Sequence, residues 1–468
     1  MLHMDEESFV HPYIPNSVPE IKRKMLRFID AGDADELYRE MIPGRLLLDR
    51  AMDLPEPTLS ELDLRRRVES ILSKNVTTGD YVSYLGAGCW RHYVPTVCDE
   101  IAGRSEFLTA YSGGGHSDLG RHQANFEFQS LICELLGMEV SGIPTYDWGS
   151  AAGNSVRMAT RLTGRREVLV PRSVSPARLS MIRNFCDSAS SSSRLTVKTV
   201  GFDAATGMVD LTDLESKVSD ETAAVYFENP NYLGVIEAEA AAVSDAAHDV
   251  GAECVCGVDP ISLGVLAPPA DYGVDIACGD AQPLGVHMYA GGGCCGFIAS
   301  RDEERYVAEY PLRLISLADT AVDGEYGFGQ ALYERTSYMA RENAKDWVGT
   351  TTVLWGFVAA VYMSLLGPQG LRELGETILQ KSHYAAQALD ELDGATVPYR
   401  TFFKEFPVAF NKPVRDVNDA LLGHRIIGGK DLSAEYPELG DAALYCVTEV
   451  HSLGMIDGLA AALREVLA

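Results

Sequence analysis

Positive charge is scarce in this sequence. The 468 residues include 39 Lys and Arg against 67 Asp and Glu, which gives a formal net charge of −28 at pH 7. Such an excess repels the phosphate backbone of a nucleic acid and the surface of an anionic membrane. We therefore expect neither nucleic acid nor a membrane among the partners of the chain.

Long apolar runs are also missing. The longest nearly apolar run, residues 353–366, is too short to span a bilayer and is typical of a buried helix. The first residues are acidic and lack the basic-then-apolar order of a signal peptide. Because 46% of the residues are apolar, the chain can nevertheless bury a large core. We expect a soluble protein of the cytoplasm.

The ten cysteines follow neither a disulfide nor a zinc pattern. Cys254 and Cys256 alternate along a strand-like run without a histidine pair nearby, and Cys294 and Cys295 are adjacent. Disulfide frameworks are typical of short secreted chains, and zinc sites require spaced pairs of Cys and His. The pattern favours a reducing compartment and predicts no metal site.

Common nucleotide-binding and hydrolase motifs are absent as well. The glycine-rich stretches at 84–90, 111–120 and 289–296 lack the Lys-Ser or Lys-Thr of a P-loop and the strand and helix context of a dinucleotide site. The stretch DWGSAAGN (147–154) does not contain the G-x-S-x-G of a nucleophile elbow. The motifs therefore give no support to a nucleotide-binding protein or a serine hydrolase.

What the sequence does contain is the pattern of an α/β protein. From about residue 165, short β-branched runs alternate with helical segments, which is typical of parallel strands joined by right-handed crossovers. We expect a helical N-terminal arm over 1–90 and a large α/β domain with a mostly parallel central sheet over 91–325. Connecting helices over 326–365 would lead to a smaller α+β domain over 366–468.

Two places in this pattern are candidates for binding a small molecule. Small residues open a helix at Gly149, Ser150 and Ala151, where backbone N–H groups face an anion in some proteins and where close packing is the alternative. Asp259 follows a strand in CVCGVDP, where a carboxylate could hold a protonated pyridine nitrogen or form a simple turn. The residues alone leave both interpretations open.

A series of stretches, in order along nearly the whole chain, resembles a single family: HPYIPNSVPEIKRKML, YLGAGCWRHYVPTVCDEI, RSEFLTAY, FEFQSLICELLGMEV, TYDWGSAAGN, ENPNYLGVIE, VDPISLGVL, GDAQPLG, RIIGGKDLS and YPELGDAALYCVTEV. That family is subunit 1, the α or N-terminal-half subunit, of the glycine cleavage system P-protein, the aminomethyl-transferring glycine dehydrogenase. The resemblance implies the fold-type I architecture of pyridoxal-phosphate (PLP) dependent transferases.

The resemblance also implies a missing reactive group. In two-subunit members of the family, subunit 2 carries the lysine that binds PLP as a Schiff base, and subunit 1 has lost it. Here the corresponding turn has Asp280 and Gln282, and an amide cannot form an imine. Ser175, which cannot stack on a pyridine ring, replaces a histidine common in the family. The pocket that we expect to be vestigial, without covalent cofactor, comprises Gly149, Ser150, Ala151, Asp259 and Gln282.

The chain departs from the family in one loop in particular. Where the family has a Thr-Pro-Tyr-Gln-Pro-Glu type of loop, residues 112–123 read SGGGHSDLGRHQ. Arg121 could hold a carboxylate with two hydrogen bonds, and His116 or His122 could transfer a proton near neutral pH. His116, Asp118, Arg121 and His122 are therefore the candidate catalytic residues, and drift of a tolerant surface loop is the alternative.

The resemblance implies that the chain is the non-lysine-bearing subunit of a PLP-dependent glycine decarboxylase type of complex. The expected partners are a PLP-binding, subunit 2-like protein, a small amino-acid substrate and, as a further candidate, a lipoyl H-protein. The rewritten loop favours a divergent homologue that acts on glycine or a glycine-derived amino acid in specialised metabolism. Two alternatives stay open: a catalytically silent structural or regulatory partner, and an independent enzyme that works without PLP.

Overall fold

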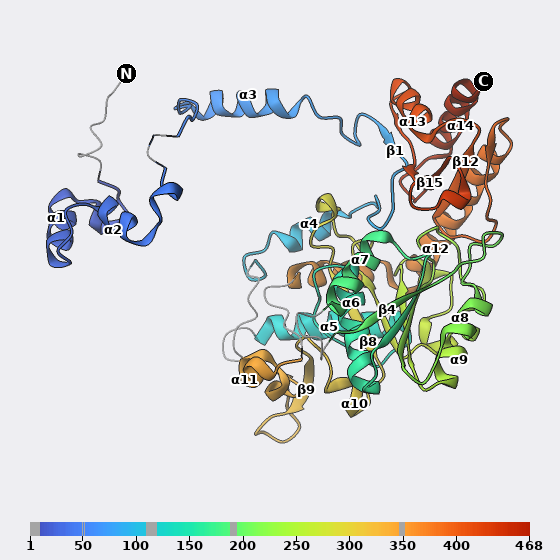
Figure 1. The fold of residues 1–468 in the computed structure, drawn as a ribbon, viewed down its shortest axis with the longest axis horizontal. Coiled ribbons are helices and arrows are strands. Elements are labelled where there is room, and N and C mark those ends of the chain that lie inside the picture. The colour runs from blue at the N-terminus through green and yellow to red at the C-terminus, as the bar shows by residue number, and fades with distance from the viewer. Residues whose placement is uncertain (1–9, 49, 51, 109–118, 188–193, 346–351) are drawn as a thin grey trace. The chain divides into compact units, whose positions relative to one another are not determined.

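The computed structural model describes residues 10–468 except 49, 51, 109–118, 188–193 and 346–351 (Figure 1). Contacts divide the chain into two units, Met1–Val76 and Thr77–Ala468.

The described part of the N-terminal unit consists of short helices and loops. Its α-helices are α1 (Pro19–Phe28), α2 (Ala34–Met41) and α3 (Glu61–Leu72), and none of them contains a buried residue. Asp33 and Ser60 cap α2 and α3 by accepting hydrogen bonds from the backbone N–H groups three residues later. The caps explain where α2 and α3 begin, and the apolar side chains of the described helices stay at least partly exposed.

The unit ends earlier than the predicted arm over 1–90. Strand β1 (Val82–Ser83) pairs with β13 (Ile426–Ile427) and so belongs to the second unit. The sequence could not show this boundary, because the pairing joins residues from opposite ends of the chain.

A seven-stranded sheet forms the centre of the second unit, in the order β2-β8-β7-β6-β5-β3-β4. Strands β3 to β7 are mutually parallel, whereas β8 is antiparallel to β7 and β2 is antiparallel to β8. The predicted mostly parallel sheet is thus confirmed. The bounds are β2 Val140–Ser141, β3 Glu167–Pro171, β4 Thr196–Val200, β5 Thr222–Glu228, β6 Glu253–Val258, β7 Ile276–Asp280 and β8 Gly296–Ser300.

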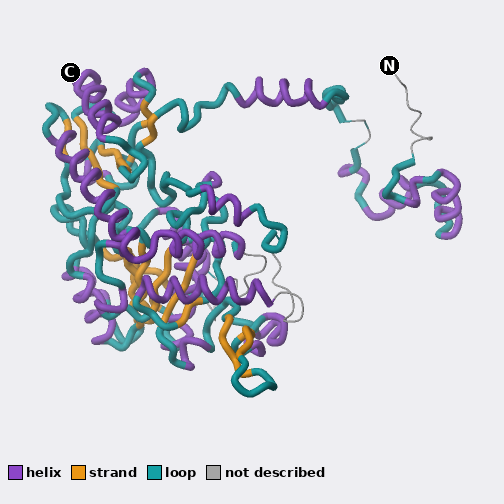
Figure 2. The backbone as a smooth tube through the Cα atoms, turned by 180° about the vertical axis from the view of Figure 1, so that it is seen from behind, coloured by secondary structure: helices purple, strands orange, loops and turns teal. Residues whose placement is uncertain are grey.

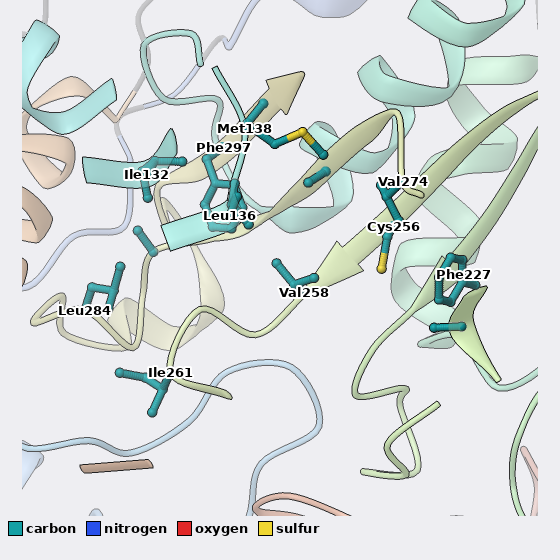
Figure 3. Packing of buried hydrophobic residues seen from close by; sticks show 14 of the residues in the cluster. Ile132, Leu136, Met138, Phe227, Cys256, Val258, Ile261, Val274, Leu284 and Phe297 are labelled. Carbon is teal, nitrogen blue, oxygen red and sulfur yellow. The ribbon is translucent and has the colours of Figure 1, made fainter. Parts of the chain in front are cut away.

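Helices cover both faces of this sheet, as Figure 2 shows. Alternate residues of a strand point to opposite faces. Phe227 of β5 and Cys256 of β6 therefore pack into one core, which Figure 3 shows, and Tyr226 and Val255 pack into the other. The first core includes residues of α5 (Leu119–Leu136), α8 (Leu211–Lys217) and α9 (Ala240–Asp249), and the second includes α6 (Trp148–Thr163) and α7 (Pro176–Cys186). Burial on both faces explains why β5, β6, β7 and β8 are buried throughout.

The region predicted as connecting helices, 326–365, contains a strand as well as helices. It begins with strand β10 (Tyr326–Gln330), which pairs with β9 (Ile315–Asp319) as an antiparallel ribbon. Short α10 (Glu304–Val307) and α11 (Ser337–Ala340) lie on either side of this ribbon in the sequence.

Helix α12 (Val353–Asp390) then runs through the predicted domain boundary at 366. It is long and apolar enough to cross a membrane by length and composition alone. Its residues Phe357, Val358 and Met363 are nevertheless buried in the two cores, and it packs against α4 (Thr96–Ala102) and α5. The helix has a kink at Gly367, just before Pro368.

The C-terminal part is a four-stranded antiparallel sheet with helices, which confirms the predicted α+β domain. The sheet has the order β11-β12-β15-β14, and α13 (Val414–Gly423) and α14 (Leu453–Leu467) contribute to its core. The strands are β11 Ala395–Thr396, β12 Glu405–Phe410, β14 Lys430–Asp431 and β15 Ala442–Cys446.

Candidate functional site at the carboxyl edge of the sheet

Several buried polar residues meet where parallel strands of the large sheet end. Glu228 is the last residue of β5, Asp259 follows β6, and Gln282 follows β7. The carboxyl edge of a parallel sheet is the usual ligand-binding side of such folds. The pocket around Asp259 is lined by residues of both the large sheet region and the C-terminal domain: Trp90, Trp148, Arg178, Pro230, Asn231, Gly234, Asp259, Phe403, Lys404 and Glu405.

The carboxylate of Asp259 forms a buried ion pair with Lys404. The Lys404 ammonium lies 2.7 Å from Asp259 Oδ2, and both side chains are almost fully buried. The same ammonium lies 3.5 Å from the centre of the Trp90 ring and 3.2 Å from His92 Nε2. Because an ammonium only donates, His92 accepts at Nε2 and donates from Nδ1 to Glu449 Oε2 at 2.9 Å. The carboxylate, the ring face and the imidazole thus surround the cation.

A second buried ion pair forms the opposite wall. Arg178, from α7, donates from Nε and Nη2 to the two carboxylate oxygens of Glu228 at 2.5 and 2.7 Å. Its guanidinium lies 4.1 Å above the Trp148 ring, and Tyr226 Oη donates to Glu228 Oε1 at 3.0 Å. Burial opposes the charge of Arg178, but the Glu228 carboxylate raises its pKa above the ordinary value. The two opposite charges of this bidentate pair offset each other, so this wall of the pocket carries no net charge.

Gln282 joins two segments of backbone. Its Nε2 donates to the carbonyl oxygens of Trp90 at 2.9 Å and Val286 at 3.1 Å, and the Trp90 N–H donates to its Oε1 at 3.0 Å. The side chain is 1% exposed. Gln282 therefore holds the segment of Trp90 against the turn after β7.

The small residues at the start of α6 serve packing. Asp147 caps this helix, because its Oδ1 accepts from the Ser150 N–H and Ser150 Oγ accepts from the Asp147 N–H. A Cβ at Gly149 would lie 3.0 Å from Met181, and one at Gly153 would lie 2.6 Å from Phe185. These contacts support the packing interpretation of Gly149, Ser150 and Ala151. The Ser150 N–H already donates to the Asp147 carboxylate, and the Ala151 N–H donates to the Asp147 carbonyl.

The residues of this pocket do not fit PLP. The cavity left between them measures about 10 Å³, which is roughly the space that one water molecule needs. Asp259, the carboxylate available for a pyridine nitrogen, already contacts Lys404, and Gln282 presents an amide instead of an amine. We therefore derive no chemistry from a cofactor in this chain.

The predicted catalytic loop is only partly described. His116 and Asp118 lie outside the described residues. Arg121 and His122 lie in the first turn of α5, and they are 5% and 2% exposed. Neither is among the residues that line the pocket around Asp259. Their assignment as catalytic residues stays a prediction.

Sequence reasoning missed the cationic residues of the pocket. Lys404 stands in the run TFFKEFPVAF, where a lysine and a glutamate interrupt an otherwise apolar strand. Charged residues are rarely fully buried unless they are paired. The run therefore indicates paired, buried charges, but nothing in it identifies Asp259 as the partner of Lys404.

Comparisons with known proteins agree with one another. A family model described as glycine cleavage system P-protein matches residues 11–457. The probable glycine dehydrogenase (decarboxylating) subunit 1 of Staphylothermus marinus is 36% identical, over 98% of each chain. A crystal structure of glycine decarboxylase (P-protein) of the glycine cleavage system, in inhibitor-bound form, has a TM-score of 0.84 at 33% identity and covers 98% of this chain and 100% of that chain.

A more distant likeness concerns the fold alone. The sphingosine-1-phosphate lyase of Burkholderia pseudomallei K96243 has a TM-score of 0.65 at 16% identity, over 91% of this chain and 94% of that chain.

Proposed function

Because the chain belongs to the family of glycine cleavage system P-proteins, we propose that it is the subunit of a PLP-dependent glycine decarboxylase complex that does not hold the cofactor. Its fold is that of fold-type I PLP-dependent proteins. One observation carries the proposal. Gln282 stands where the amine is expected, and its amide is engaged in hydrogen bonds with the backbone of Trp90 and Val286.

In this proposal a subunit 2-like partner holds PLP on a lysine of its own. Bound there, the cofactor supplies the electron sink that loss of carbon dioxide from an amino acid requires. The substrate is glycine or a glycine-derived amino acid, and a lipoyl H-protein is the candidate acceptor. A heterotetramer in the cytoplasm is the assembly that we expect, and the rewritten loop 112–123 is the reason for proposing a role in specialised, biosynthetic metabolism.

This chain would contribute binding surface and shape to the complex. The described helices of its N-terminal unit expose large apolar side chains, among them Met25, Phe28 and Met41. Apolar surface of this extent usually marks a protein interface. The same observation favours a second candidate function, that of a silent structural partner that stabilises the PLP-binding subunit.

Reconstitution with the lysine-bearing subunit separates these functions. We expect the purified chain to be colourless with PLP, and the complex to show cofactor absorbance and to exchange bicarbonate carbon with glycine. Borohydride trapping and peptide mapping should place the cofactor on a lysine of the partner. A trapped adduct on a lysine of this chain would refute the proposal.

A matched variant distinguishes a contributing subunit from a silent one. Arg121→Gln removes the charge of one candidate catalytic residue while keeping a side chain that forms hydrogen bonds. If the chain contributes to catalysis through its loop, the intact complex should lose at least tenfold in exchange rate. An unchanged rate in a complex that still forms would favour the silent function. Lys430→Ala, which removes a partly exposed lysine elsewhere, serves as the control.

A further inference from the structure

Asp259 lies where an uncompensated charge would be costly. It is 3% exposed, and its Oδ1 accepts a hydrogen bond from the Ile261 N–H at 3.2 Å. A buried carboxylate needs a cation or a proton to offset the loss of hydration. The position after β6 therefore requires a positive charge close to Oδ2.

Lys404 provides that charge from another domain. It directly precedes β12 of the C-terminal sheet, and its side chain is 2% exposed. Its ammonium contacts Asp259 Oδ2, the Trp90 ring and His92 Nε2. An ammonium has three N–H donors, so one carboxylate, one ring face and one imidazole nitrogen account for its surroundings.

The site thus has the composition of a binding site for an organic cation. A carboxylate sits at one side and an aromatic face at another, and the apolar rings of Trp148 and Phe403 line the remainder. Such combinations recognise alkylammonium and related cations in many proteins. The methylene groups of Lys404 take up the space that the alkyl chain of a free ligand would need, and little cavity remains beside them.

We propose that Lys404 is a built-in ligand of this site: its ammonium occupies an organic-cation site formed by Asp259, Trp90 and His92. The pocket accordingly stays closed to external cations in the native protein. Removal of the lysine side chain beyond Cβ would convert it into a site for a free primary alkylammonium ion. The inference concerns the isolated chain and holds whether or not the proposed function is correct.

Chemical rescue of Lys404→Ala tests the inference directly. This substitution removes the three methylene groups and the ammonium beyond Cβ, which together match n-propylammonium. We expect the variant to melt roughly 4–6 °C below the wild type, because a buried carboxylate loses its partner. n-Propylammonium chloride should raise its Tm in a saturable manner, because a ligand of the folded state stabilises it by mass action. Sodium chloride at the same ionic strength should not.

Matched variants make the result specific. The wild type and Lys404→Met should not respond to n-propylammonium, because a side chain still fills the site. Lys430→Ala removes an ion pair with Glu435 that is about one-third exposed, and it should change the Tm little and show no rescue. A folded Lys404→Ala variant that gains no stability from n-propylammonium would overturn the inference.

If Lys404→Ala fails to fold, a second pair of variants tests whether Lys404 neutralises Asp259. Lys404→Met leaves the Asp259 carboxylate buried and unpaired, whereas Lys404→Met with Asp259→Asn removes both charges. We expect the double variant to recover at least half of the Tm that the single variant loses. A double variant no more stable than the single one would show that the two groups are not coupled, and the inference would fail.

Discussion

At the scale of single residues, Asp280 shows how burial controls a charge. It is the last residue of β7 and is 2% exposed. Burial raises the pKa of its carboxyl well above the ordinary value of 3.8, and the nearby Cys89 adds to this shift. The hydrogen bond from the Gln282 N–H and the charge of Arg178 oppose the shift without cancelling it. Folding therefore favours the protonated carboxyl relative to the unfolded chain.

This raised pKa gives stability a pH dependence of definite sign. The folded state keeps a proton that the unfolded chain releases above its ordinary pKa, so the stabilising contribution is complete at low pH and is lost as pH rises toward the folded pKa. Asp280→Asn imitates the protonated carboxyl at every pH. Measured between pH 5 and 8, its Tm should gain on the wild type as pH rises, by up to about 1–2 °C for each pH unit until the folded pKa is reached.

Thermal unfolding of both proteins across this range provides the measurement. Asp319→Asn is a suitable control, because Asp319 also ends a strand but is exposed. The control should follow the wild type at every pH. Parallel curves for Asp280→Asn and the wild type would show that the carboxyl is already ionised in the fold.

At the scale of elements, the contact of α6 with α7 depends on two glycines. Gly149 and Gly153 lie one turn apart and face Met181 and Phe185, which are also one turn apart. A Cβ at Gly153 would lie 2.6 Å from the Phe185 ring, closer than carbon atoms approach. The pairing therefore requires the absence of a side chain at this position.

Gly153→Ala should lower stability although alanine favours helix formation. Overpacking typically costs 1–3 kcal/mol, which corresponds to a Tm lower by about 1–4 °C in a chain of this size. Gly458→Ala is the matched control, because Gly458 lies in α14 with open space around its Cα. It should leave the Tm unchanged or raise it slightly. Equal effects of the two substitutions would contradict the close packing of α6 on α7.

The elements also show how far the sequence predicts this protein. The parallel sheet was predictable, since β-branched runs such as 222–228 alternate with helical segments. Helix α12 crosses the domain boundary predicted at 366, because Gly367 and Pro368 bend the helix without terminating it. Asp259 and Gln282 could be placed at one sheet edge because each follows a parallel strand. Lys404 could not, because its contact joins two sheets that no local pattern relates.

At the scale of the whole molecule, the N-terminal unit exposes an apolar helix face. On α1, Ile21, Met25 and Phe28 lie on one face, and all three are more than 40% exposed. None of the described helices of this unit has a buried residue. An apolar face of this kind gains stability when it docks on another surface.

Association with the proposed PLP-binding subunit should therefore depend on α1. We expect Met25→Glu with Phe28→Glu to weaken the complex at least tenfold, because two charges would be buried without partners. Arg23→Gln on the same helix should change the affinity less than twofold. Titration followed by native mass spectrometry or calorimetry gives both numbers. Undiminished affinity of the double variant would place the interface on Thr77–Ala468 instead.

The hydrogen bonds of Gln282 make this position intolerant of an amine. Its carboxamide holds the Trp90 backbone by accepting with its oxygen and donating with its nitrogen. An ammonium only donates, so a lysine at this position would leave the Trp90 N–H without its acceptor. It would also bring a charge to a position that is 1% exposed. The substitution Gln282→Lys should therefore loosen the segment of Trp90 before it could serve any chemistry.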